Sequence, residues 1–93
     1  MDEARVLLFG RSGCHLCVEG RVVVAAVCAE TGDRWLEVDV DGPDPTGAGR
    51  DLAEEYGDLV PVVEVDGVRQ GFWRIDPARL RRALAASAGP PLR

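Results

Sequence analysis

Residues 6–17, VLLFGRSGCHLC, decide the fold of this chain. A short apolar run that ends at a glycine is typical of a buried strand, and an apolar helical pattern follows from Cys14 to about Glu30. Cys14 and Cys17 therefore lie at a strand-to-helix turn. At a helix start, unpaired backbone N–H groups and the positive end of the helix dipole favour the thiolate, which is the nucleophilic form of cysteine. This position favours redox chemistry for the pair.

The apolar pattern along the whole chain predicts an α/β layer fold. Seven elements are expected in the order β-α-β-α-β-β-α, at residues 5–9, 14–30, 34–40, 51–56, 62–65 and 68–73, with a last helix from residue 76. A parallel β-α-β unit followed by a hairpin gives a four-stranded mixed sheet. We expect the strand order 2-1-3-4, with helices on both faces of the sheet.

Local signals mark where several of these elements begin and end. Gly32 is expected to take the left-handed conformation that ends the first helix. Asp66 and Gly67 form a two-residue hairpin signal between the third and fourth strands. Asp76 is expected to cap the last helix, with Pro77 as its first residue.

Length and composition indicate one small domain. The chain has 93 residues, so we expect a single domain over residues 1–93, with a core at about 5–86 and a frayed tail at 89–93. The net charge of −5 argues against a nucleic-acid partner. The first residues do not have the pattern of a signal peptide, and no apolar run approaches membrane-spanning length. With an odd count of three cysteines, these features predict a cytoplasmic protein without a membrane partner.

These motifs resemble those of the glutaredoxins, the smallest members of the thioredoxin fold, and most of all the short bacterial glutaredoxin-like proteins. The resemblance covers residues 5–86 and rests on the C-x-x-C after the first strand, on Val60-Pro61 before the third strand, and on residues 71–76 before the last helix. It implies a thiol–disulfide oxidoreductase that serves electron transport and cell redox homeostasis. Cys14 would be the attacking thiolate, and Cys17 would resolve the mixed disulfide.

The resemblance also implies a substrate or glutathione site beside Cys14. The family has a cis proline before the third strand, so Val60-Pro61 is expected to be cis. Val60 would then offer backbone groups to glutathione or to an extended peptide. Gly71 and Asp76 match positions at which the family binds the glutamyl group of glutathione.

The sequence departs from the family pattern in this same region. Leu59 stands where threonine is usual, and Phe72-Trp73 follows Gly71 where a second glycine and acidic residues are usual. Both glutathione and a protein reductase therefore stay open as the reductant. No tightly bound cofactor is expected, glutathione is the candidate co-substrate, and the partner is a disulfide-containing protein or a glutathione mixed disulfide bound by a monomer.

Arg11 and His15 are candidates for tuning the nucleophile. Arg11 matches a basic position common in glutaredoxins, where it can stabilise the thiolate or hold a glutathione carboxylate. The alternative is a solvated loop residue. His15 stands in place of the usual proline; its imidazolium could stabilise the thiolate, or it is an exposed residue with a mild effect.

Two other uses of the cysteines remain as alternatives. Structural zinc needs four ligands, and Cys14 and Cys17 supply only two, so a metal or an iron–sulfur cluster would need further ligands from glutathione or a second chain. A redox-inactive interaction domain is the other alternative. Cys28 is expected to be a small core residue, about three helical turns beyond Cys17.

Overall fold

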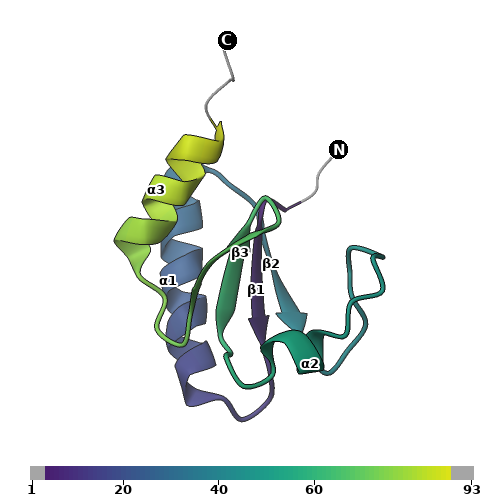
Figure 1. Cartoon of the computed structure of the whole chain (residues 1–93). Helices are drawn as coiled ribbons and strands as arrows, with labels where there is room; N and C mark the ends of the chain where they lie inside the picture. Colours follow the sequence, from purple (N-terminus) through teal and green to yellow (C-terminus); the bar gives the residue numbers. More distant parts are fainter. Residues whose placement is uncertain (1–3, 89–93) are drawn as a thin grey trace.

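The computed structural model of the chain describes residues 4–88 (Figure 1). Its elements follow the predicted order, with end points that lie within one or two residues of those expected. They are β1 (Val6–Gly10), α1 (His15–Thr31), β2 (Trp35–Asp39), α2 (Leu52–Tyr56), β3 (Val62–Val65), β4 (Val68–Phe72) and α3 (Pro77–Ala88). The tail that was expected to fray, residues 89–93, lies outside the described residues.

The four strands form one mixed sheet in the order β2-β1-β3-β4, which confirms the predicted order. β1 pairs with β2 in parallel, and β3 runs antiparallel to both β1 and β4. β1 is therefore a central strand, and its carboxyl end leads directly into the loop that carries the cysteine pair (Figure 1).

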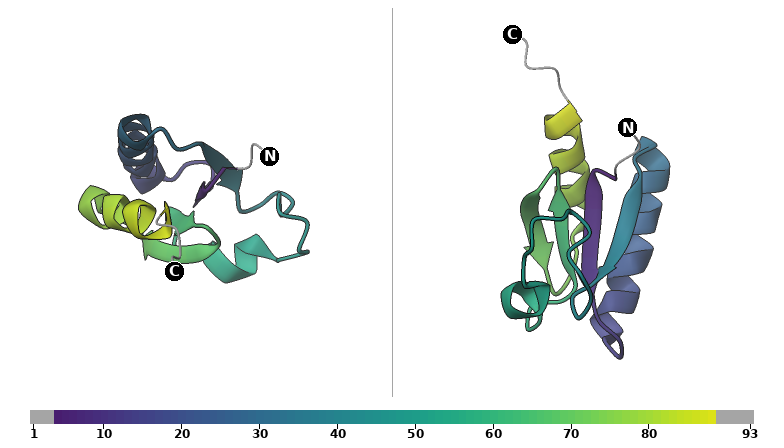
Figure 2. Two further views of the ribbon diagram at one scale, coloured as in Figure 1. Left: turned by 90° about the horizontal axis from the view of Figure 1, so that it is seen from above. Right: turned by 90° about the vertical axis from the view of Figure 1, so that its right-hand side faces the viewer.

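Alternation along the strands separates the core into two parts, because successive side chains point to opposite faces of a sheet. Val6 and Leu8 of β1 pack with residues of α1 and α3, whereas Phe9 packs with residues of α2. The two long helices thus cover one face of the sheet and the short α2 lies on the other (Figure 2). The prediction of helices on both faces is confirmed.

The predicted turn signals take the expected conformations. Gly32 caps α1 at φ 79°, a left-handed conformation that a side chain disfavours. Asp66 and Gly67, at φ 51° and 85°, form the turn between β3 and β4. Asp76 Oδ1 accepts a hydrogen bond from the Ala78 N–H at 3.0 Å at the start of α3, as expected of an N-cap residue.

One buried polar cluster was not predicted from the sequence. Glu64 lies in β3 with only 2% of its surface exposed, and its Oε2 accepts hydrogen bonds from Tyr56 Oη at 2.5 Å and Arg50 Nη2 at 2.8 Å. Among residues 4–88, Oε1 of Glu64 has no hydrogen-bond partner. The cluster connects α2 and the loop before it to the sheet.

None of the helices between residues 4 and 88 is long and apolar enough to cross a membrane.

Candidate active site

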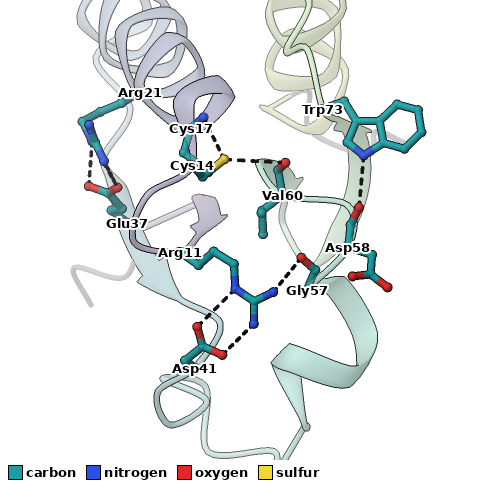
Figure 3. The surroundings of a disulfide bond; sticks show 10 residues. All are labelled: Arg11, Cys14, Cys17, Arg21, Glu37, Asp41, Gly57, Asp58, Val60 and Trp73. Carbon is teal, nitrogen blue, oxygen red and sulfur yellow. Dashed lines mark hydrogen bonds and ion pairs between the residues drawn. A yellow bond between two sulfur atoms is a disulfide. The ribbon is translucent and has the colours of Figure 1, made fainter.

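The two cysteines of the C-x-x-C motif lie at the start of α1 and are joined as a disulfide (Figure 3). Their Cα atoms are 5.2 Å apart, within the range of native disulfides. Cys14 is the N-cap residue of the helix, and its Sγ accepts a hydrogen bond from the Cys17 N–H at 3.1 Å. Cys14 is partly exposed, whereas Cys17 is buried. Of the two cysteines, Cys14 is thus the one that is accessible from solvent.

Two glycines of the loop make this geometry feasible. Gly13 has φ 80°, which turns the chain from β1 into the helix at little steric cost. A Cβ atom on Gly10 would lie 3.1 Å from Cys17 Sγ, so the absence of a side chain at Gly10 leaves room for the buried sulfur. The segment between strand and helix is therefore shaped around Cys17 as well as Cys14.

The Val60–Pro61 peptide bond is cis, as predicted. The carbonyl oxygen of Val60 lies 3.9 Å from Cys14 Sγ, so the residue before the proline faces the outer cysteine (Figure 3). On the other side of the loop, the backbone N–H of Trp73 donates to the carbonyl oxygens of Leu59 at 3.2 Å and Pro61 at 2.9 Å. Gly20 of α1 packs against the Pro61 ring. The loop is thus held by the residue that follows β4 and by α1.

The structure places Arg11 beside the loop that follows β2. Its guanidinium donates to both carboxylate oxygens of Asp41, at 3.2 and 2.7 Å, and to the carbonyl oxygen of Gly57 at 3.1 Å (Figure 3). The pKa of Arg11 is raised by the hydrogen bonds to Asp41, and the pKa of Asp41 is lowered by the same contact. Arg11 therefore connects three loops at the base of the site.

The other predicted site residues are spread around the cysteines. His15 is exposed at the first position of α1. Gly71 lies within β4, opposite Val63. Asp76 is exposed and caps α3. The structure brings Cys14, Cys17 and Val60 together, whereas Gly71 and Asp76 take part in the strand and in the helix start.

Trp73 takes part in this site through both its backbone and its side chain. Its backbone takes φ 63°, an uncommon conformation for a bulky residue, and its indole N–H donates to the Asp58 carbonyl oxygen at 3.2 Å. With Leu16, Phe72 and Arg74, it lines an open pocket of about 380 Å³. The departure from the family pattern at Phe72-Trp73 was the signal in the sequence, but it did not predict a pocket.

Cys28 is a buried free cysteine in the core between α1, α3 and the sheet, as predicted. Burial raises the pKa of its thiol, which disfavours the reactive thiolate. Within residues 4–88, no group of three or more histidine, cysteine, aspartate or glutamate side chains could hold a metal ion.

The sheet order, the cysteine pair at the start of α1 and the cis proline facing it define a thioredoxin-like α/β protein with a redox-type site. More narrowly, the chain belongs to the family described as Glutaredoxin-like domain (DUF836), whose model matches residues 5–85.

Sequence similarity to related proteins extends over almost the whole chain. The uncharacterized proteins Rv0508 of Mycobacterium tuberculosis (strain ATCC 25618 / H37Rv) and Mb0520 of Mycobacterium bovis are each 37% identical to it, over 98% of this chain and 95% of theirs. Among solved structures, protein XcR50 from X. campestris is similar with a TM-score of 0.64 and 29% identity, over 91% of this chain and 99% of that one. Protein Ne2328 from Nitrosomonas europaea has the same fold, with a TM-score of 0.67 at 21% identity, over 89% of this chain and 93% of that one.

Proposed function

We propose that this protein is a thiol–disulfide oxidoreductase that works through Cys14 and Cys17. One observation carries the proposal: the partly exposed Cys14 Sγ lies at the N-cap of α1, accepts the Cys17 N–H, and faces the Val60 carbonyl group. A helix N-terminus stabilises a negative charge through its free N–H groups and its dipole. In the reduced protein, the charge that it would stabilise is the Cys14 thiolate.

The reaction consists of two exchanges that balance in atoms and electrons. First, the Cys14 thiolate attacks one sulfur of a substrate disulfide, which forms a mixed disulfide and releases the other sulfur as a thiolate. Cys17, after losing its proton to solvent, then attacks Cys14 Sγ and releases the second substrate thiolate. The substrate disulfide gains two electrons and becomes two thiols, while the protein dithiol becomes the Cys14–Cys17 disulfide.

The difference in burial between the two cysteines supports a separate role for each. A substrate sulfur can approach Cys14 from solvent, but it cannot reach Cys17, which is 3% exposed. Cys17 is nevertheless close enough to Cys14 for the bond between them to form. This arrangement supports Cys14 as the attacking residue and Cys17 as the resolving one.

The Val60 segment is the proposed substrate-binding edge. Leu59 and Pro61 direct their carbonyl groups to Trp73, and Val60 between them directs its carbonyl group toward Cys14. Such alternation lets an extended peptide add to the edge as a strand beside the reacting sulfur. Two glutathione molecules, which become glutathione disulfide, or one reduced protein dithiol, which becomes a disulfide, would restore the Cys14–Cys17 dithiol, and a cytoplasmic location would supply such thiols.

The test is a redox titration of the protein in glutathione buffers, with Cys14 and Cys17 followed by mass, together with the variants Cys17→Ser and Cys14→Ser. We expect a reversible disulfide in the unmodified protein, a stable mixed disulfide on Cys14 in Cys17→Ser, and no exchange in Cys14→Ser. Failure to form the disulfide at any potential would overturn the proposal. Visible absorbance after anaerobic purification would favour a metal or an iron–sulfur cluster instead.

A further inference from the structure

An exposed apolar pocket lies beside the redox site. Leu16, from α1 between the two cysteines, faces Phe72 and Trp73 from the end of β4. Phe72 and Trp73 are 40% and 52% exposed, respectively. Single exposed apolar residues are common on protein surfaces, but apolar residues grouped in a pocket next to a reactive atom indicate binding. A volume of about 380 Å³ suits one or two side chains.

The pocket is fixed relative to Cys14 by the backbone of the Val60 loop. The backbone N–H of Trp73 donates to the carbonyl groups of Leu59 and Pro61. The carbonyl group of Val60, between these two residues, faces Cys14 Sγ. In Figure 3, Val60 lies between the disulfide and Trp73. A chain that binds along Val60 therefore passes both the reacting sulfur and the pocket.

The walls of the pocket are held in place. The Trp73 indole N–H is bonded to the Asp58 carbonyl oxygen, and the Phe72 and Trp73 rings meet edge to face with centroids 5.1 Å apart. These contacts hold the indole in one orientation although half of its surface is exposed. Because the wall is already ordered, binding a side chain does not have to immobilise it, and the entropy lost on binding is smaller.

Three arginines around the site already have carboxylate partners, whereas Arg69 packs its guanidinium on the Phe72 ring, 5.6 Å from the ring centroid. Arg11 pairs with Asp41 at 2.7 Å, and Arg21 pairs with Glu37 at 2.6 Å. Arg74, which lines the pocket, pairs with Glu19 at 3.1 Å. To bind Arg11, Arg21 or Arg74, a ligand carboxylate, such as either of the two in glutathione, would have to displace the carboxylate that is already there. A neutral apolar side chain meets no such competition.

We propose that the pocket of Leu16, Phe72 and Trp73 binds an apolar side chain within two residues of the reacting cysteine of a protein disulfide. The preferred substrates are therefore extended protein segments with an apolar residue next to the cysteine, in preference to glutathione disulfide. This inference rests on the proposed function, because it assigns the substrate class of the same site. The exchange itself is the two-electron reaction described above, with the protein dithiol as reductant.

The test measures a single turnover of the pre-reduced protein, without any added reductase. The substrates are symmetric disulfides of a blocked tetrapeptide with leucine, serine or aspartate next to its cysteine, as well as glutathione disulfide and the small uncharged hydroxyethyl disulfide. Formation of the Cys14–Cys17 disulfide is followed by mass. We expect the leucine peptide to react about tenfold faster than the serine peptide at limiting concentration, and glutathione disulfide to be slower still.

Variants separate binding at the pocket from the chemistry at sulfur. In Trp73→Gly, which suits the positive φ, and in Phe72→Ala, the rate for the leucine peptide should fall to within about twofold of the rate for the serine peptide; each rate is divided by that of hydroxyethyl disulfide for the same variant, so that a general loss of exchange does not count as lost preference. The matched control is Val68→Ala, another exposed apolar residue of β4 that does not line the pocket. Equal rates for the three peptides, or a preference that survives both variants, would overturn the inference. If hydroxyethyl disulfide also failed to react with the unmodified protein, the proposed function itself would fail.

Discussion

Cys14, Cys17 and Cys28 are identical side chains in three different environments. Cys14 is partly exposed and lies beside the free N–H groups at the start of α1. Cys17 lies in the first turn of the same helix but is buried, and Cys28 lies in the core. Because the thiolate is the reactive form, environment decides which sulfur does chemistry. At this scale the site depends on the positions of single atoms.

The first prediction concerns alkylation of the reduced protein by iodoacetamide. Cys14 should be modified at least about tenfold faster than Cys17 or Cys28, because only Cys14 is both accessible and at a helix start. Burial raises the pKa of Cys28, so its modification should require unfolding. Peptide mapping by mass gives the order of modification, with protein in denaturant as the control. Equal rates at Cys14 and Cys28 in the native protein would contradict it.

The second prediction tests whether His15 tunes the reduction potential. Proline is well tolerated at the first position of a helix, and Cys14 before it has the extended conformation (ψ 110°) that proline requires of its neighbour. An imidazolium at His15 would stabilise the Cys14 thiolate and hence the reduced protein. His15→Pro should therefore lower the potential by roughly 10–30 mV in mildly acidic glutathione buffers.

His15→Gln serves as the control for His15→Pro, because it removes the charge without changing the backbone. A similar shift in both variants would assign the effect to the charge, and a shift in His15→Pro alone would assign it to the backbone. No shift in either variant would leave His15 an exposed residue without a tuning role.

At the scale of elements, the site is made where α1, the Val60 loop and β4 meet. Gly20 lies on the buried side of α1, one turn beyond Cys17, and a Cβ there would lie 3.1 and 3.2 Å from two ring atoms of Pro61. This glycine therefore sets how closely the helix approaches the loop. The spacing between Cys14 and Val60 depends on the packing of entire elements.

The third prediction is that Gly20→Ala slows disulfide exchange without unfolding the protein. The added methyl group should move the Pro61 loop away from α1 by a few tenths of an ångström, while the helix gains about 1 kcal/mol of intrinsic propensity. We expect exchange with peptide disulfides to slow severalfold and the free energy of unfolding to change by less than about 1 kcal/mol. Ala25→Gly, on the exposed side of α1, is the control and should leave the exchange rate unchanged. Unchanged exchange in Gly20→Ala would contradict the assigned spacing role.

Much of this element-level organisation could be predicted from the sequence. The strand at 62–65, the helix caps and the hairpin turn follow from local patterns, because glycine, proline and aspartate have strong local preferences. The cis proline and the roles of Cys14 and Cys17 were expected from the resemblance to glutaredoxins. The cis bond is confirmed, while the two roles stay predictions.

The rest depends on contacts between residues far apart in the chain. Arg11 forms an ion pair with Asp41, which lies thirty residues further along the chain. The Trp73 indole N–H donates to the Asp58 carbonyl oxygen across the Val60 loop. Glu64 interrupts an apolar strand pattern, but only the folded chain shows that Arg50 and Tyr56 surround it. Local sequence patterns cannot identify such partners, because the side chains meet only after the sheet and helices have packed.

At the scale of the whole molecule, the two faces of the sheet are stabilised differently. The face under α1 and α3 is packed with apolar side chains, whereas the face under α2 includes the Arg50–Tyr56–Glu64 cluster. Arg50 also lies over the rings of Phe9 and Tyr56, with 5.6 Å from its guanidinium to each centroid. Attachment of α2 therefore depends on charge as well as on burial.

The fourth prediction follows from the pKa of Tyr56. Burial, and next the hydrogen bond to Glu64, raise that pKa from the usual 10 to about 12. Because the folded value exceeds the unfolded one, the contribution to stability is complete below pH 10 and is lost as the pH rises toward 12. The loss should be on the order of 2 kcal/mol.

Tyr56 is the one tyrosine in the chain, so phenolate absorbance measures its ionisation directly. The measurement is a titration of absorbance, together with urea unfolding at several alkaline pH values. Tyr56→Phe should cost about 1–2 kcal/mol at neutral pH and should lack the tyrosine-dependent part of the alkaline loss. Ionisation near pH 10 in the folded protein would show that the hydroxyl is not held as described.

The Cys14–Cys17 bond closes a ring of only four residues within one helix start. Chain-entropy arguments give such a short ring about 2 kcal/mol of stabilisation, against about 4.7 kcal/mol for a bond that closes a hundred residues. The bond joins no two strands and does not join α1 to α3, so neither the pairing of the strands nor the packing of these helices requires it. We therefore expect the bond to be a removable part of the architecture: reduction of the disulfide should leave the sheet and the packing of the helices as they are.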